Sequence, residues 1–584
     1  MKKCNVSQFL YPFLLILAVA LTWCTVGGFE YVRYDDNLYT WDYPNVASGL
    51  NWDGVKGVFA NLTQGGIWMP LTSITYMLDI TLWGAGPGPH HLASVFYHAV
   101  NAVLVYILIL RLLKTDNGEE LPNAAFAAFV GTALWALHPQ RCESVSWIAS
   151  RKDLVFTLFV LLGLHSWLSA AQSKFRLLLV YVFMALACMG KPTAMVFPVV
   201  AFCVRPDRDW KKYLPMFALT VAVAILTVHS QTHPTGDDTM FVRGMNEGYG
   251  SLAWRVLNAA VAVGLYFAQF VVPYGIHVCY RPHVGSIPEG AVIGLAVLVI
   301  ACSVFAVCVW RGARAKKPIR TLLLSALWFL AAIGPTLGVA GGFGHHARAD
   351  RFLYLPMIAV AWLLSRMLVR VKLNALAKCA LGILSLAYAI ATLENSNTYK
   401  SDFELFGRAL KFDPDSVFAM THVAAEYCAK LHDPDKGIEL YRRAICLEPD
   451  NDEPRELLAF ALATRGNPKD AGEVFNILAP LVERPELDLR GKATAALGAM
   501  SMLRHDWSNA IRFLKQALTG KDAKKLFDDT AMRLAMCYYN TKDYDSAKPL
   551  LQRLSISKRP EVAAKARELI YYIYQKEQPL IRAK

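Results

Sequence analysis

The chain lacks the cysteine patterns that stabilise small secreted proteins or bind metals. Its twelve cysteines include no Cys-x-x-Cys pair and follow no regular spacing, and several lie inside apolar runs. Cysteines in such runs behave as small apolar residues, so the sequence predicts neither a disulfide framework nor a zinc site. No small-x-small cleavage motif follows the first apolar run, FLYPFLLILAVALTW, so we expect a retained anchor with its N-terminus inside.

Apolar residues, in contrast, are abundant. The 584 residues are 55% hydrophobic and 12% aromatic, with a mean hydropathy of +0.31, which is too apolar for a soluble protein of this size. The formal net charge of +14 could suggest nucleic acid, but Lys and Arg fall mostly in short clusters between apolar segments. That distribution follows the positive-inside rule. The composition predicts a multi-pass membrane protein without a nucleic-acid partner.

The apolar segments of residues 1–394 predict about eleven membrane spans. The segment Leu252–Val272 is interrupted by polar residues. If it crossed the membrane fully, the basic stretch RGARAKKPIR would lie outside, against the positive-inside rule. We therefore expect this segment to be interfacial or re-entrant. A long first loop, residues 28–90, is expected outside. Its two amphipathic pieces, WDGVKGVFANL and PLTSITYMLDITLWG, are expected to lie in the membrane interface.

Residues 395–584 have a charged, helical pattern with a period of roughly 35 residues. FDPDS recurs as LEPDN, and Gly437, Ala471, Ala510 and Ala547 each open a predicted helix. This matches tetratricopeptide repeats, whose helix pairs form a grooved superhelix that binds peptide or protein. The predicted fold class is therefore all-α: a polytopic membrane bundle over residues 1–394, followed by a tetratricopeptide-repeat solenoid over residues 395–584.

Two adjacent carboxylates, Asp35 and Asp36, stand in the aromatic stretch EYVRYDDNLYTWDY shortly after the first apolar segment. The loop that carries them is long, and long loops in compact proteins are usually functional. One hypothesis is the catalytic loop of a membrane enzyme. The alternative is that the two acids are a helix N-cap and a solvated turn residue.

Ionisable residues also mark every outward-facing turn of the predicted bundle. Such groups are costly at membrane depth, so a set on one face favours a site. Basic groups there could hold a lipid-linked phosphate, and a carboxylate could take a proton from a hydroxyl. Structural roles remain open, and the histidine spacing matches no metal template. The set comprises Asp35, Asp36, Asp79, His90, His91, His138, Arg141, Glu143, Arg151, Asp153, Lys191, His345, His346, Arg348, Asp350 and Arg351.

Several motifs together resemble a known family. YDDNLYTWDYPNVASGLNWDGV, GPHHLASVFYHAVNAVL, LWALHPQRCESVSWIASRKDL, GKPTAMVFPVV and ARADRFLYLP, followed by repeats, resemble membrane-embedded glycosyltransferases with C-terminal tetratricopeptide repeats. This is the protein O-mannosyltransferase-like branch of the C-type, lipid-donor superfamily. The resemblance covers nearly the whole chain. It implies inverting transfer of a mannose-like sugar from a polyprenyl-phosphate donor to an acceptor hydroxyl, expected to be a protein Ser or Thr, on the outer side of the membrane.

The resemblance also implies roles for residues. The family's first-loop acidic motif falls on Asp35 and Asp36, one of which would be the general base; Asp36 is marginally favoured because it ends the motif. The repeat groove would present the acceptor, the polyprenyl tail would lie between spans, and the need for a divalent cation is left open. Lys191, Arg348 and Arg351 would bind the donor phosphate, and the pocket would be formed by His90, His91, His138, Glu143, Arg151, Asp153 and Tyr354.

Two departures bear on specificity more than on reaction class. Relatives commonly show Trp-His-Pro-Leu where this chain has Trp68-Met69-Pro70-Leu71, and Arg33 stands where a small polar residue is usual. Two other functions remain open. One is a non-catalytic membrane scaffold that uses its repeats in envelope or polysaccharide assembly. The other is a lipid-linked glycan ligase or flippase, although a flippase would be expected to need polar groups through the bilayer.

The sequence gives only indirect evidence of location. It carries no eukaryotic retention signal and its loops are short, which favours a bacterial inner membrane with the repeats in the periplasm. In a eukaryote the same topology would place the repeats in the lumen of the endoplasmic reticulum.

Overall fold

The computed structural model describes residues 7–62, 66–114, 121–232, 251–281, 289–315, 319–339, 348–483, 490–519 and 523–581. In these ranges the regular structure is helical and no β-strand occurs. The chain forms two compact units, Met1–Asp413 and Pro414–Lys584. The all-α fold class is confirmed.

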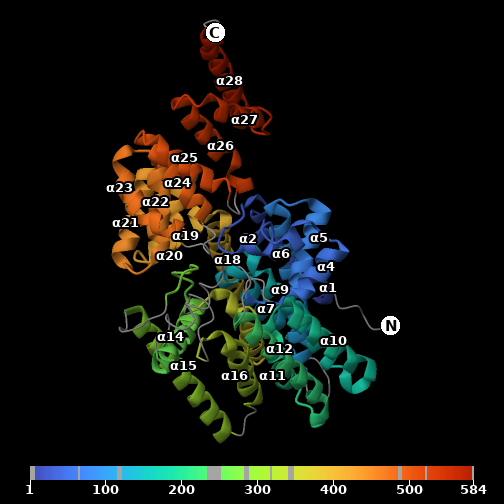
Figure 1. Ribbon diagram of the computed structural model, residues 1–584. Coiled ribbons are helices and arrows are strands. Elements are labelled where there is room, and N and C mark those ends of the chain that lie inside the picture. The colour runs from blue at the N-terminus through green and yellow to red at the C-terminus, as the bar shows by residue number, and fades with distance from the viewer. Residues whose placement is uncertain are drawn as a thin grey trace. The chain divides into compact units, whose positions relative to one another are not determined.

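Unit 1 is built from helices (Figure 1). Apolar side chains fill its interior. Its helices are α1 (Ser7–Thr22), η1 (Val26–Gly28), α2 (Asp36–Tyr39), α3 (Pro44–Ala47), α4 (Trp52–Ala60), α5 (Pro70–Trp83), α6 (Pro87–Leu112), α7 (Ala124–Ala136), η3 (Pro139–Arg141), α8 (Cys142–Ser146), η4 (Ile148–Ser150), α9 (Arg151–Trp167), η5 (Ala170–Gln172), α10 (Lys174–Gly190), η6 (Pro192–Val196), α11 (Phe197–Val204), η7 (Trp210–Tyr213), α12 (Leu214–Thr232), α14 (Leu252–Val271), α15 (Glu289–Arg314), α16 (Arg320–Ile333), η8 (Gly334–Thr336), η9 (Asp350–Leu353), α17 (Pro356–Leu368), α18 (Ala375–Ser396), η10 (Asn397–Lys400) and α19 (Asp402–Phe412).

Six helical segments among the described residues are long and apolar enough to cross a membrane. Four further apolar helices are shorter, so the predicted number of about eleven spans stays a prediction. The six belong to α1, α6, α12, α14, α15 and α18, and cover Phe9–Gly28, Pro87–Leu112, Trp210–Ser230, Leu252–Val271, Gly290–Arg314 and Ala375–Lys400. Unit 1 thus has the helices of a multi-pass membrane bundle.

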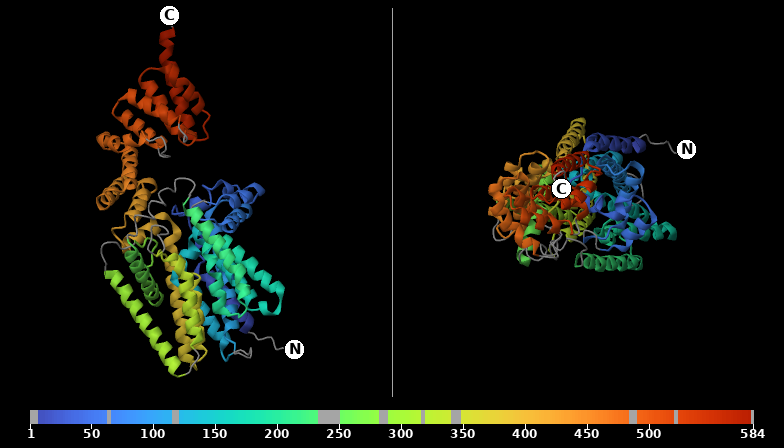
Figure 2. Two further views of the ribbon diagram at one scale, coloured as in Figure 1. Left: turned by 60° about the horizontal axis from the view of Figure 1, so that its bottom comes forward. Right: turned by 45° about the horizontal axis from the view of Figure 1, so that its top comes forward.

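The segment expected to be interfacial or re-entrant forms one unbroken helix, α14, which lies beside α15 (Figures 1 and 2). Two glycines allow the close approach of the two helices. A Cβ atom at Gly264 would lie 1.8 Å from the carbonyl oxygen of Gly294, far inside van der Waals contact. Small residues at such crossings let membrane helices pack backbone to backbone. Whether α14 lies in the interface or crosses stays a prediction.

Outside the long helices, short segments bring polar side chains together. The first loop contains the helices α2 to α5. The two amphipathic pieces predicted in this loop form α4 and α5. α2 contacts η4, and α8 contacts η9. These contacts join parts of the chain more than 100 residues apart, and they build the candidate site.

Unit 2 is a succession of helices in which each packs against the next (Figure 1). The predicted small positions are buried: Gly437, Ala471, Ala510 and Ala547 all lie where neighbouring helices meet. A Cβ atom at Gly437 would lie 2.4 Å from the sulfur of Cys428, so only glycine fits there. Its helices are α20 (Val417–Ala429), α21 (Pro434–Leu447), α22 (Asp452–Arg465), η11 (Pro468–Asp470), α23 (Ala471–Val482), α24 (Arg490–Leu503), α25 (Trp507–Ala517), α26 (Ala523–Asn540), α27 (Tyr544–Leu554) and α28 (Pro560–Ile581).

A repeated local signal starts three of these helices. A residue with positive φ turns the chain, and the aspartate after it caps the helix by accepting a hydrogen bond from a first-turn amide, which satisfies one of the open N–H groups. The pairs are His432 and Asp433, His505 and Asp506, and Lys542 and Asp543.

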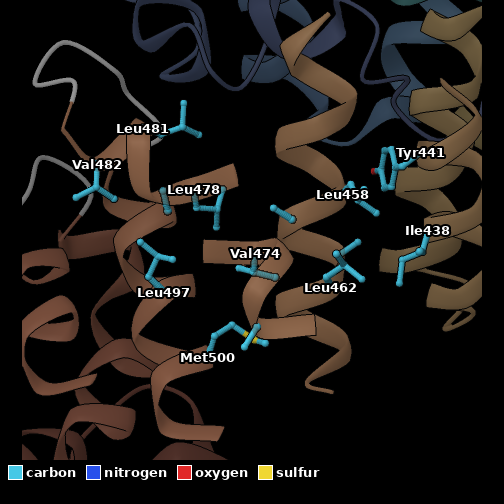
Figure 3. Close-up of a cluster of buried hydrophobic side chains, with 14 of the residues drawn as sticks. Ile438, Tyr441, Leu458, Leu462, Val474, Leu478, Leu481, Val482, Leu497 and Met500 are labelled. Carbon is cyan, nitrogen blue, oxygen red and sulfur yellow. The ribbon is translucent and has the colours of Figure 1, made fainter. Parts of the chain in front are cut away.

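Apolar side chains from successive helices form a shared core. Figure 3 shows part of this core, in which side chains of α21 to α24 interdigitate. No helix pair buries its apolar face alone, as expected of a repeat solenoid. The labelled members are Ile438, Tyr441, Leu458, Leu462, Val474, Leu478, Leu481, Val482, Leu497 and Met500.

The contact between α14 and α15 gives a first prediction. Replacing Gly264 with valine should force the two helices apart and destabilise the full-length chain in detergent by roughly 3 kcal/mol or more. The measurement is the midpoint of thermal unfolding. Gly290→Val is the matched control, because a Cβ atom there meets nothing within 4 Å. Equal midpoints for the two variants would contradict the packing described.

Candidate active site

Asp36 fixes the acidic loop to the rest of unit 1. Its side chain is fully buried, with Oδ2 accepting a hydrogen bond from the Val32 amide (2.9 Å) and Oδ1 accepting one from the Ala149 amide (2.8 Å). The hydroxyl of Thr40 donates to the Asp36 carbonyl oxygen (2.5 Å). Burial raises the pKa of Asp36 to about 7, although the two amides act in the opposite direction. Asp36 therefore positions the loop, and both of its oxygens are engaged.

Asp35 has a different environment. It is only half-buried, and although it is the N-cap residue of α2, its side chain makes no capping hydrogen bond to the described α2 amides. It lies close enough to Lys152 and Arg351 to interact electrostatically with both. The preceding residue, Tyr34, stacks on Trp147 with ring centroids 4.7 Å apart. The structure thus gives the two adjacent acids different surroundings.

Two ion pairs contain charged groups that interact electrostatically with Lys152. Lys191 Nζ is 2.6 Å from Asp153 Oδ1. The Arg351 guanidinium pairs with Glu143, whose Oε2 also accepts a hydrogen bond from the Arg351 amide (2.9 Å). Burial lowers the pKa of Lys191, and Asp153 opposes that shift. We call Asp35, Glu143, Lys152, Asp153, Lys191 and Arg351 the charged cluster.

The members of the charged cluster come from separate elements. Glu143 belongs to α8 and Arg351 to η9, while Asp153 lies in the first turn of α9 and Lys191 at the end of α10. A cavity of about 10 Å³ borders the Asp153–Lys191 pair, and its other walls include apolar side chains of α9, α17 and the α16–η8 segment. Its size suits about one water molecule. The charged groups therefore adjoin apolar helix surfaces.

A second group forms a buried network around Asp79, and its members His90, His91 and Arg151 were expected to line the pocket. Asp79 Oδ2 lies 2.8 Å from His90 Nδ1 and 2.6 Å from Arg151 Nη1, and all three side chains are buried. Arg151 also donates to the His90 carbonyl oxygen (2.6 Å). His91 Nε2 lies 3.2 Å from the Glu30 carbonyl oxygen. This network joins α5, α6 and α9 and ties α6 to the loop.

Arg348 belongs to a third group. Its Nη1 donates to Gln269 Oε1 (2.6 Å), and its guanidinium lies 3.6 Å from the centroid of the Tyr280 ring. The Tyr280 hydroxyl donates to Asp350 Oδ2 (3.0 Å). Burial raises the pKa of Asp350 to about 7, with Arg348 acting against the shift. These contacts tie residues 348–350 to α14 and the segment that follows it.

The remaining predicted residues lie in the bundle interior or outside the described part. The Tyr354 hydroxyl is 2.7 Å from His98 Nδ1, and His138 Nε2 is 3.0 Å from the Phe270 carbonyl oxygen. His345 and His346 fall outside the described residues. Within the described ranges, no three His, Cys, Asp or Glu side chains converge as metal ligands would.

Two features were missed by sequence reasoning. Lys152, which had no assigned role, projects over Tyr39 with its Nζ 4.5 Å from the ring centroid and 5.9 Å from that of Trp147. Consecutive helical residues point about 100° apart, so Arg151 joins the Asp79 network while Lys152 and Asp153 have different direct contacts within the charged cluster. The signal in the sequence was that Lys152 lies between two charged residues, Arg151 and Asp153, at the start of a helix.

The second missed feature is the packing of α19, which follows the last apolar helix, against the acidic loop. Asp402 Oδ1 accepts a hydrogen bond from the Arg33 amide (2.7 Å), and the Glu30 amide donates to the Lys400 carbonyl oxygen (2.9 Å). Phe406 meets the edge of Tyr34. Nothing local in the sequence links residues 30–34 with residues 400–406.

Comparisons with known proteins give modest similarity. No family model matches. Over 356 residues the chain is 22% identical to protein O-mannosyl-transferase F38B6.6 of Caenorhabditis elegans, covering 60% of this chain and 49% of that protein. It is 33% identical over 112 residues to protein O-mannosyl-transferase TMTC1 of Homo sapiens (19% and 12% covered) and 29% identical over 106 residues to TMTC4 of Mus musculus (17% and 14% covered).

The chain spans about half the length of the first of these relatives and less of the other two. Among solved structures, yeast Tom70 matches with 12% identity, covering 78% of this chain and 93% of that chain, at a TM-score of 0.22. A TM-score that low does not indicate a shared overall fold.

The environment of Asp36 gives a second prediction, on pH. In the unfolded chain Asp36 loses its proton near pH 4, whereas the folded chain holds it up to about pH 7. The stability contributed by this group is therefore fully present below about pH 4 and lost as the pH rises to about 7. The wild type should lose a few kcal/mol of stability between about pH 5 and about pH 8 that Asp36→Asn does not lose.

The measurement is the unfolding midpoint of both proteins at each pH. Asp53→Asn, which alters a carboxylate whose side chain is 94% exposed, should retain the wild-type pH dependence. The environment assigned to Asp36 is wrong if Asp36→Asn and the wild type show the same pH dependence.

Proposed function

We propose that the chain is an integral-membrane glycosyltransferase that moves a mannose-like sugar from a polyprenyl phosphate to a protein Ser or Thr hydroxyl. The observation that carries the proposal is the charged cluster, in which a half-buried carboxylate, Asp35, lies within electrostatic range of two buried or largely buried cations, Lys152 and Arg351. The similarity to proteins named O-mannosyl-transferases supports the same reaction class.

Asp35 is the proposed general base. Its partial exposure lets an acceptor hydroxyl approach, whereas the two oxygens of Asp36 are held by backbone amides and shielded from water. As Asp35 takes the hydroxyl proton, the acceptor oxygen attacks the anomeric carbon. The bond from that carbon to the phosphate oxygen breaks, and its electron pair leaves with the polyprenyl phosphate. Attack opposite the leaving group inverts the anomeric configuration.

The charges of the cluster suit this step. Lys152, Lys191 and Arg351 balance Asp35, Glu143 and Asp153, so the cluster is formally neutral before the reaction. When Asp35 is protonated, the cluster gains one net positive charge, while the departing phosphate gains one negative charge. Preorganised cations act strongly on developing charge in sites shielded from water. The Lys191–Asp153 and Arg351–Glu143 pairs keep two of the cations in place.

We further propose that unit 2 binds the acceptor protein. Its described residues line a cavity of about 500 Å³. Methionines, which adapt to varied partners, contribute to the wall as Met502, Met532 and Met536, and the rim carries charged side chains including Arg533 and Lys565. A surface that combines flexible apolar contacts with charge suits extended polypeptide. The repeats would then face the periplasm or the lumen.

The central test replaces the proposed base. Asp35→Asn should lower glycosyl transfer at least about a hundredfold, because general-base catalysis contributes factors of that order. The assay uses membranes with matched expression and a panel of radiolabelled polyprenyl-phosphate sugars. Asp53→Asn, on the same loop but exposed, should transfer at the wild-type rate.

The donor in the panel from which the wild type transfers radiolabel would also identify the sugar. Transfer by Asp35→Asn at the wild-type rate would contradict the assignment of the base. Absence of transfer by the wild type with every donor, while unit 2 still captures a defined protein partner, would favour a membrane scaffold.

A further inference from the structure

One cation of the charged cluster, Lys152, is buried and forms no ion pair with the residues that the structure describes, although Asp35 lies within electrostatic range. Lys152 is 4% exposed, and its ammonium forms neither a hydrogen bond nor an ion pair with any residue of the described ranges. Its only recorded contacts in those ranges are the faces of Tyr39 and Trp147, with Nζ 4.5 Å and 5.9 Å from the ring centroids. Aromatic faces attract a cation but leave its charge and its N–H donors unsatisfied.

The neighbouring basic residues are already engaged. Lys191 pairs with Asp153 and Arg351 with Glu143, in both cases with a carboxylate that is 2% exposed. Drawing either cation away would leave a buried carboxylate without its partner, which is costly. Arg348 donates to Gln269 and stacks on Tyr280 in a separate group. Lys152 is therefore the member of the cluster that can accept an anion without breaking an existing pair.

We propose that Lys152 binds the phosphoryl group of the substrate, a role that the family resemblance implies for Lys191, Arg348 and Arg351. The inference rests on the proposed function and deepens it. An ammonium with three free N–H donors suits phosphate oxygens. Lys152 also lies within electrostatic range of Asp35, so a phosphate bound there would be held in the same site as the proposed base.

The same phosphate chemistry could belong to a membrane lipid or to a soluble molecule. The cluster adjoins apolar walls formed in part by Phe156, Phe352 and Leu355. The described helices of unit 1 that are long and apolar enough to cross a membrane favour a phosphate whose other substituent is a hydrocarbon chain. Inorganic phosphate and a nucleoside diphosphate are the soluble probes that distinguish the two sources.

The test is equilibrium binding of radiolabelled polyprenyl monophosphate to the full-length chain in lipid nanodiscs, without sugar or acceptor. Lys152→Gln should weaken binding by roughly ten- to a hundredfold, the range expected for loss of a charged hydrogen bond. Lys152→Arg should retain most of the affinity. Lys56→Gln is the matched control, because the Lys56 side chain is 59% exposed on α4.

Competition identifies the source of the phosphate. Inorganic phosphate or nucleoside diphosphate should displace the lipid only at far higher concentration. Displacement by either one at the concentration of the lipid itself would overturn the lipid assignment. Wild-type affinity in Lys152→Gln would overturn the role of Lys152.

A second measurement needs no variant and covers the case in which Lys152→Gln does not fold. Acylation of lysines in the wild-type chain, followed by mass spectrometry, should show Lys152 protected by polyprenyl monophosphate and Lys56 unaffected. Equal labelling of Lys152 with and without the lipid would overturn the proposal. Because neither assay involves sugar transfer, their outcome is independent of the outcome of the Asp35→Asn test.

Discussion

Two backbone amides, from Val32 and Ala149, hold the Asp36 carboxylate inside unit 1. One amide belongs to the acidic loop itself and the other to η4, which leads directly into α9. That single side chain therefore fixes the loop to the helix start that carries Lys152 and Asp153. Asp35, the preceding residue, is thereby held within electrostatic range of Lys152 and Arg351. A buried carboxylate with both oxygens satisfied by amides is a strong anchor, since any displacement would leave polar groups unpaired.

The cluster also illustrates how a buried charge can be kept available. Ion pairs shielded from water add little net stability, but breaking one is costly. The Asp153–Lys191 and Glu143–Arg351 pairs are therefore best understood as rigid supports that set the electrostatic environment. Lys152 lies over aromatic faces instead, and its ammonium forms no hydrogen bond with the residues that the structure describes. In this account Asp35 is the general base and Lys152 binds the phosphate, and the two ion pairs keep the surrounding side chains in place.

The sequence predicted the repeating parts of the fold well, because their signals are local. Apolar runs gave the membrane helices, and small residues such as Gly437 and Ala510 marked helix contacts in the solenoid. The site was harder to predict. The family resemblance implied that Arg348 and Arg351 act together on the donor phosphate. In the structure, Arg348 donates to Gln269 and stacks on Tyr280, whereas Arg351 pairs with Glu143. The contact of Asp402 with Arg33 depends on tertiary packing across the whole of unit 1, which no local pattern encodes.

The most direct test of the central claim is the structure of the full-length chain in nanodiscs with a non-cleavable polyprenyl phosphonate analogue of the sugar donor, solved by electron cryo-microscopy. The account predicts the phosphonate oxygens within hydrogen-bond distance of Lys152 Nζ, the anomeric carbon facing Asp35, and the Lys191–Asp153 and Arg351–Glu143 pairs intact. Density for the phosphonate beside Arg348 and Asp350, or with the sugar turned away from Asp35, would contradict it.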